Sequence, residues 1–143
     1  MQTICIYSII FLMKDILRKS GLKATPARLQ LLEFLQSVAK PVTVADIMAN
    51  PEISSSINQS TAYRSLDQMA ERGIIYKTYF DNESAWYEWQ ETHHHHVTCS
   101  DCGYREAFSS CFVPTNILDQ TKKFTKIDRH IVELFGRCQK CDN

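Results

Sequence analysis

Four of the six cysteines stand in two C-x-x-C pairs with 35 residues between them. The pairs are Cys99/Cys102 and Cys138/Cys141. Each pair offers two sulfurs on one tight turn, and Gly103 allows the first turn to bend, so the pattern matches a closed tetrahedral zinc site. We predict structural zinc that pins together the two ends of the C-terminal half. A pair of redox-active dithiols is the alternative, and Cys5 and Cys111 are expected to be inert buried thiols.

Four consecutive histidines, His93 to His96, precede the first cysteine pair. In an extended chain His94 and His96 lie on one face and His93 and His95 on the other, so one run could supply two metal sites. Candidate co-ligands with a carboxylate or an imidazole are Glu88, Glu106 and His130. A solvated loop of histidines without ligands is the alternative.

Motifs of known hydrolytic chemistry are absent from the sequence. Neither H-x-E followed by P-C-x-x-C nor H-E-x-x-H occurs. A nucleophilic Cys–His pair is compatible with the spacing, but cysteines in C-x-x-C turns more often bind metal. We therefore predict that the protein is not an enzyme.

The N-terminal half is predicted to contain helices followed by a hairpin. From Met13 the pattern turns helical, and further helices are expected at about 26–38 behind Thr25-Pro26, after Thr43 to about Asn50, and at about 60–72. Between Pro51 and Asn58 the serines at 54–56 are expected to form a turn or loop, and Gly73 ends the third of these helices. A period of two then predicts strands at 74–80 and 85–89 around a turn at 81–84. This order is typical of a winged helix-turn-helix, whose third helix enters the major groove.

The C-terminal half is predicted to be a small unit of strands and one helix. Strands are expected at 96–108 and 127–136, with an amphipathic helix at 114–123. The predicted fold class is α+β, a winged helix-turn-helix over 13–90 followed by a small zinc-stabilised α/β unit over 91–143.

The first twelve residues are apolar but lack the positive region and cleavage site of a signal peptide. They are also too short to span a membrane. We expect that translation begins at Met13; an extra turn of helix and a tail that touches a membrane are the alternatives.

The composition fits a soluble globular protein. The chain has 143 residues, 44% hydrophobic and 22% charged, with four Gly and four Pro, which excludes disordered and collagen-like classes. Sixteen basic and sixteen acidic residues give zero net charge, which argues against indiscriminate binding to nucleic acid or acidic lipid. Residues 13–40 hold six basic side chains and two acidic ones. This local excess favours a DNA-binding face, although a solvated helix surface would look the same.

Three segments together resemble the ferric uptake regulator family of metal-dependent transcriptional repressors. Residues 21–28 read GLKATPAR, residues 60–66 read STAYRSL, and residues 93–103 read HHHHVTCSDCG. The resemblance implies a cytoplasmic homodimer, with residues 91–143 as its dimerisation and metal-sensing domain. It also implies that the dimer binds a double-stranded DNA operator, makes no membrane contact, and represses metal-uptake genes when a regulatory divalent metal is bound.

The resemblance also implies roles for individual residues. Lys23 would reach the minor groove, and the recognition helix would contact DNA through Ser60, Thr61, Tyr63 and Arg64. The four paired cysteines would hold structural zinc. The regulatory site would contain Glu88, His94 and His96. A second site would contain His93, His95 and His130, with Glu106 as a further candidate.

Three positions depart from the family pattern. Lys40-Pro41 stand where many members have a histidine, Ala107 occupies the usual acidic position with Glu106 one residue earlier, and His95 replaces a common aspartate. Fewer oxygen ligands and more nitrogen favour zinc over iron(II) or manganese(II) as the regulatory metal. A repressor that senses peroxide or thiol oxidation on the same scaffold is the alternative. A zinc-stabilised interaction module or enzyme without a DNA role is a third interpretation.

Overall fold

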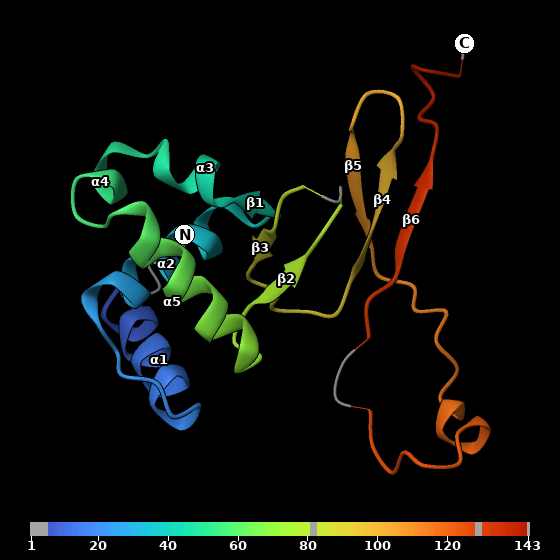
Figure 1. Ribbon diagram of the computed structural model, residues 1–143, viewed down its shortest axis with the longest axis horizontal. Helices are drawn as coiled ribbons and strands as arrows, with labels where there is room; N and C mark the ends of the chain where they lie inside the picture. The colour runs from blue at the N-terminus through green and yellow to red at the C-terminus, as the bar shows by residue number, and fades with distance from the viewer. Residues whose placement is uncertain (1–5, 81–82, 128–129, 143) are drawn as a thin grey trace. The chain divides into compact units, whose positions relative to one another are not determined.

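The computed structural model divides the chain into two compact units, with the division between Glu91 and Thr92 (Figure 1). The structure describes residues 6–80, 83–127 and 130–142, and only the backbone of 6–8. Cys5 and part of the predicted turn at 81–84 therefore lie outside the described residues.

The N-terminal unit contains five helices among its described residues. They are α1 (Ile6–Lys19), α2 (Pro26–Val38), α3 (Val44–Met48), α4 (Pro51–Ser54) and α5 (Gln59–Glu71). The helix predicted from Met13 begins already at Ile6. The loop predicted after Pro51 is wrong at its start, because α4 forms a single turn there. The Asn50 side chain accepts hydrogen bonds from the amides of Glu52 and Ile53, and Pro51 takes the first helical position.

Side-chain caps define the other helix ends. The Thr25 hydroxyl accepts from the Arg28 amide at 3.3 Å, and the Asn58 side chain accepts from the Thr61 amide at 2.8 Å. Gly73 follows α5 with φ +71°, a left-handed conformation that glycine adopts without strain. The predicted bounds of α2 are thus confirmed, and those of α5 are correct to within one residue.

A three-stranded antiparallel sheet completes this unit. Its strands are β1 (Val42–Thr43), β2 (Tyr76–Thr78) and β3 (Trp86–Glu88), in the order β1-β3-β2. The predicted hairpin is β2–β3. The two-residue strand β1 gives no period that a sequence pattern could detect. Helices α2, α3 and α5 with this sheet form a winged helix-turn-helix.

The hydrophobic core lies in the N-terminal unit. Side chains from α1, α2 and α5 meet there with Tyr87 of β3, and several are fully buried: Leu17, Leu31, Leu32, Leu35, Leu66 and Met69. This core holds α5 against the rest of the unit and leaves its opposite face available.

The C-terminal unit is a second three-stranded sheet. Its strands are β4 (His95–Cys99), β5 (Arg105–Phe108) and β6 (Glu133–Gly136), in the order β5-β4-β6, with β4 antiparallel to β5 and parallel to β6. The single strand predicted at 96–108 is therefore two strands, because Gly103 (φ +75°) turns the chain between them. The predicted helix at 114–123 is only the 3₁₀ turn η1 (Ile117–Gln120), whose first residue lacks a side-chain cap. Among the described residues of the strand predicted at 127–136, only the last four form the strand β6.

The C-terminal unit buries little apolar surface. Among its described residues, the buried side chains are Cys99, His95, His96 and Thr98. Large apolar side chains are exposed instead: Tyr104, Phe112, Phe124, Ile127, Ile131, Leu134 and Phe135. Taken alone, this unit lacks the core that normally stabilises a small domain. None of the described helices is both long and apolar enough to span a bilayer.

Candidate metal centres and DNA-binding helix

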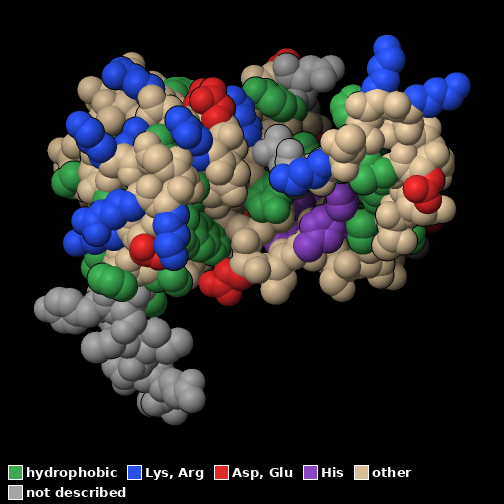
Figure 2. All heavy atoms as spheres, turned by 90° about the horizontal axis from the view of Figure 1, so that it is seen from below, with side chains coloured by type: hydrophobic (Ala, Val, Ile, Leu, Met, Phe, Trp, Pro, Cys, Tyr) green, Lys and Arg blue, Asp and Glu red, His purple; other side chains and the backbone are tan. Residues whose placement is uncertain are grey.

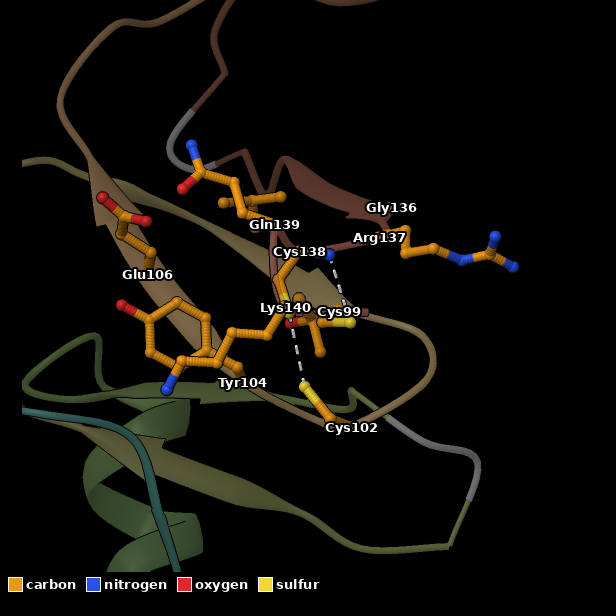
Figure 3. Close-up of a pocket in the computed structure, with 11 residues that line it drawn as sticks. Cys99, Cys102, Tyr104, Glu106, Gly136, Arg137, Cys138, Gln139 and Lys140 are labelled. Atoms are coloured by element: carbon orange, nitrogen blue, oxygen red, sulfur yellow. Dashed lines mark hydrogen bonds between the residues drawn. The ribbon is translucent and has the colours of Figure 1, made fainter. Parts of the chain in front are cut away.

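The structure brings the four paired cysteines together. Cys99 ends β4, Cys102 lies in the turn that follows, and Cys138 and Cys141 come after β6. Their sulfur atoms all lie within 4.8 Å of one another, and the sulfurs of Cys102 and Cys138 are 3.7 Å apart. Figure 3 shows Cys99, Cys102 and Cys138 pointing toward one another at one end of a pocket. Two segments far apart in the sequence thus supply four sulfur donors to one site.

The electrostatics of this cluster favour a dication. Hydrogen bonds from the backbone amides of Cys102 and Cys138 lower the pKa of Cys99 to about 6, the second of them at 3.3 Å. The thiols of Cys138 and Cys102 beside Cys141 raise its pKa to about 12. Four adjacent sulfurs therefore cannot all ionise unless a cation offsets their charge. A zinc ion would supply that charge, and the five described cysteines are all free of disulfides.

His93, His95 and His130 form a second cluster on one face of the sheet, together with Cys111. The Nε2 atoms of His93 and His95 are 3.0 Å apart, and the Cys111 sulfur lies 3.2 Å from Nε2 of His130. Burial lowers the pKa of His95, and the neighbouring imidazoles of His93, His130, His94 and His96 lower it further, so its ring is neutral and can act as a ligand. The expectation that Cys111 is buried is wrong, since the side chain is exposed.

Glu106, a candidate for the second site, lies elsewhere. It is paired with Val97, whereas His95 is paired with Phe108 at the end of β5. Glu106 lines the pocket that also contains Cys99, Cys102 and Cys138, at the end away from Cys102 (Figure 3). Glu106 therefore lies apart from the histidines that it was expected to join. The pair His96–Ala107 stands between the pair Val97–Glu106 and the pair His95–Phe108.

His94 and His96 lie on the other face of β4, as the alternation predicts. Their ring centroids are 4.9 Å apart, and Nδ1 of His94 lies 2.9 Å from the carbonyl oxygen of Thr92. His96 is buried. Its neighbours in the sheet are Ala107 on β5 and Glu133 on β6.

Glu133 is a carboxylate that sequence reasoning missed. Burial raises its pKa, and the charges of Arg105 and His96 partly offset this effect. Its parallel pairing with His96 depends on the register between β4 and β6, two strands far apart in the chain. The only local signal is a carboxylate inside the otherwise apolar run from Ile131 to Phe135.

Glu88, the remaining candidate for the regulatory site, ends β3 in the N-terminal unit. Its side chain is 5% exposed, and its carboxylate accepts a hydrogen bond from Nε2 of Gln90 at 2.8 Å. Three residues later the chain crosses into the C-terminal unit, between Glu91 and Thr92.

The N-terminal unit presents the residues expected to contact DNA. Ser60, Tyr63 and Arg64 are exposed on α5 and Thr61 is half-buried, while Ala62 between them is buried. Figure 2 shows many Lys and Arg side chains on the face of this unit turned to the viewer. Helix α5 therefore has one face in the core and a polar face available for a ligand.

Hydrogen bonds centred on two side chains, Arg28 and Asp67, hold α5 to its surroundings, and the sequence predicted neither. The Arg28 guanidinium donates to the Lys23 carbonyl oxygen at 2.7 Å and to Oε1 of Gln68 on α5 at 2.5 Å, so it joins the Lys23 loop to the recognition helix. On the other side, Oδ1 of Asp67 accepts from Lys77 of β2 at 2.8 Å and from the hydroxyl of Tyr87 at 2.6 Å.

A family model described as the ferric uptake regulator family matches residues 19–135. The chain belongs to the ferric uptake regulator family. The ferric uptake regulation protein of Yersinia pestis is 32% identical over 127 residues, which cover 86% of each chain. The ferric uptake regulator of Pseudomonas aeruginosa, solved with manganese, is 25% identical with a TM-score of 0.69 and covers 90% of this chain and 98% of its own. A zinc uptake regulator in complex with zinc and DNA shares the fold, with 18% identity, a TM-score of 0.64, and coverage of 95% of this chain and 94% of that one.

Membership of the family defines the general activity of the protein. It is a metal-responsive regulator of transcription that binds DNA, and it is not an enzyme. The predicted fold class is confirmed, with mixed helices and sheets and a cysteine cluster suited to zinc.

Proposed function

We propose that the protein is a homodimeric repressor of metal-uptake genes whose regulatory metal is held by Glu88, His94 and His96. The observation that carries the proposal is the pairing of His94 and His96 on one face of β4, immediately after the chain enters the C-terminal unit. Two imidazoles and a carboxylate are a donor set typical of zinc and iron(II) sites.

A metal bound by this set would favour one arrangement of the two units. Glu88 belongs to the N-terminal unit and the two histidines to the C-terminal unit. A metal bound by all three side chains therefore restricts how the two units can be placed relative to one another. The metal shifts the equilibrium between arrangements of the two units to the extent that it binds one arrangement more tightly than the others. In a dimer, that arrangement would set the spacing of the two α5 helices to successive major-groove half-sites.

The donors favour zinc as the regulatory metal. Lys40-Pro41 offer no imidazole, and Ala107 offers no oxygen on the face of His96. Glu133 on β6 is the acidic side chain paired with His96 there, and it would add one negative charge near the metal. Iron(II) and manganese(II) favour octahedral sites richer in oxygen, whereas zinc accepts few ligands.

The exposed apolar side chains of the C-terminal unit support a homodimer. Leu134 and Phe135 of β6 and Tyr104 beside β5 are exposed, in a unit whose described residues bury almost no apolar side chain. Apolar side chains exposed in this number favour an interface with another protein, and a second copy would supply the missing core.

Operator contacts are proposed for the exposed face of α5 and for Lys23. Arg64 and Lys23 carry the positive charge for phosphates, while Tyr63, Ser60 and Thr61 offer apolar and hydroxyl groups to base edges. Phosphate contacts make binding depend on salt, so the affinity should fall steeply as salt increases.

Replacement of both His94 and His96 by alanine tests the regulatory site. We expect metal-dependent DNA binding to be lost while the dimer and its structural zinc persist, as measured by fluorescence anisotropy of labelled operator DNA, gel filtration and metal counting. Ser100→Ala is the matched control, because Ser100 is exposed just after β4 and belongs to none of the proposed metal sites, so this variant should leave the response intact. Unchanged repression by the double variant would contradict the proposal.

A further inference from the structure

We infer that Cys111 completes the second metal site expected at His93, His95 and His130, and that its thiolate makes this site prefer zinc and other thiophilic divalent ions to iron(II) and manganese(II). All four residues belong to the C-terminal unit. The site is distinct from the regulatory site at His94 and His96, so the inference stands whether or not that proposal holds.

The four donor atoms converge as a metal site requires. One donor atom from each residue lies within 4.8 Å of every other. Tetrahedral zinc with bonds to nitrogen and sulfur places its ligand atoms about 3.3–3.6 Å apart. The separations of 3.0 Å between the His93 and His95 nitrogens and 3.2 Å between the Cys111 sulfur and the His130 nitrogen are close to that range.

The orientation of the rings gives a second line of support. The His93 ring meets the His95 ring at 90° with centroids 4.5 Å apart, and it meets the His130 ring at 64° with centroids 4.7 Å apart. Rings that meet edge to face can direct their nitrogens at a common point, whereas parallel stacking would direct them along parallel lines. A cation between the nitrogens would replace their mutual contact with coordination bonds.

The fold explains why a cysteine completes this site. His95 is paired with Phe108 at the end of β5, and the chain that leaves β5 reaches Cys111 three residues later on the same side of the cluster. His130 arrives from the segment before β6. Glu106, the nearby carboxylate on β5, is paired with Val97 and instead lines the pocket that contains Cys99, Cys102 and Cys138.

The donor set determines the class of metal. Three imidazoles and one thiolate contain no oxygen donor, and sulfur selects zinc, cobalt(II) and similar ions over the harder manganese(II) and iron(II). Cys111 and His93 are exposed, so an ion can reach the site from solvent, while His95 is buried behind them. Bound metal would tie the loop after β5 to β4.

Cobalt(II) titration tests the inference in the full chain with its structural zinc retained. We expect a thiolate-to-cobalt charge-transfer band and tetrahedral ligand-field bands in the wild type. Cys111→Ser should lose the charge-transfer band and weaken zinc binding at this site by at least about 100-fold. Replacing a residue that only orients a metal ligand usually costs less than that. Bound zinc should also protect Cys111 from alkylation.

Three control variants separate the possible results. Ser110→Ala changes the same loop without removing a donor and should leave the band intact. His94→Ala should also keep the band even if it abolishes the response to metal on DNA, so failure here is distinguishable from failure of the regulatory site. Cys111→Asp should still bind metal but shift its preference toward manganese(II). The inference is overturned if Cys111→Ser and the wild type give the same cobalt spectrum and zinc affinity.

Discussion

Asp67 is expected to hold the recognition helix to the wing, and its removal is a quantitative test of the N-terminal unit. A single oxygen of Asp67 accepts from the fully buried Tyr87 and from Lys77. A hydrogen bond to a charged group contributes about 1.5–3 kcal/mol. The ion pair between Lys77 and Asp67 contributes only about 0–1 kcal/mol, because solvent screens it. The side chains of Lys77 and Asp67 are 26% and 42% exposed.

Asp67→Ala should therefore lower the free energy of unfolding of the N-terminal unit by about 2–3 kcal/mol. In a unit of this size, the loss corresponds to a fall in melting temperature of about 10 °C or more. Asp67→Asn keeps an acceptor for Tyr87 and should cost about half as much. Lys77→Ala removes only the ion pair and is the matched control, with an expected loss below about 1 kcal/mol.

The stability that Asp67 contributes should also depend on pH in a predictable direction. Burial opposes ionisation of Asp67, but hydrogen bonds from Lys77 and Tyr87 outweigh it and lower its pKa below the usual 3.8. A carboxylate with a lowered pKa stabilises the folded state above its unfolded pKa, and this contribution is lost as the pH falls through the folded value. The gap in unfolding free energy between wild type and Asp67→Asn should therefore shrink in acid. Chemical denaturation at several pH values measures it, and a loss for Asp67→Ala within about 0.5 kcal/mol of zero would refute the reasoning.

Three further outcomes are expected. Cys141→Ser should lose the structural zinc and unfold the C-terminal unit while the N-terminal unit persists, as seen by metal counting and limited proteolysis; a stable zinc-free C-terminal unit would contradict this. Arg28→Ala should weaken operator binding, because the Lys23 loop is no longer joined to α5 through Gln68, and should cost about 1 kcal/mol of stability; unchanged DNA affinity would exclude a positioning role. Burial raises the pKa of Glu133, so the metal-free protein should lose stability as pH rises through the usual glutamate range. Glu133→Gln should abolish that dependence and weaken metal binding at the regulatory site, as calorimetry would measure.

Local patterns predicted much of the fold. The caps at Thr25 and Asn58 and the glycine after α5 define helix ends through contacts within a few residues, so the sequence alone predicts α2 and α5 well. The alternation of the four histidines likewise follows from strand geometry and correctly separates two faces. Such features need no knowledge of distant segments.

Long-range register explains the features that the sequence did not predict. Cys111 joins the second cluster because the end of β5 lies beside His95, and Glu133 faces His96 because β4 and β6 pair in parallel. The predicted helix at 114–123 contains apolar residues at helical spacing, yet it forms only a 3₁₀ turn without a side-chain cap. Propensity is a weak guide where capping and packing partners are few.

The most direct test of the central claim is DNA binding by the wild-type chain, measured by anisotropy while zinc, iron(II) and manganese(II) are added separately to protein whose metal content has been counted. We predict tightly held zinc in the cysteine site and DNA binding that appears only when more metal is added, with zinc the most effective. DNA binding that does not respond to any of the three metals would contradict a regulatory site at Glu88, His94 and His96.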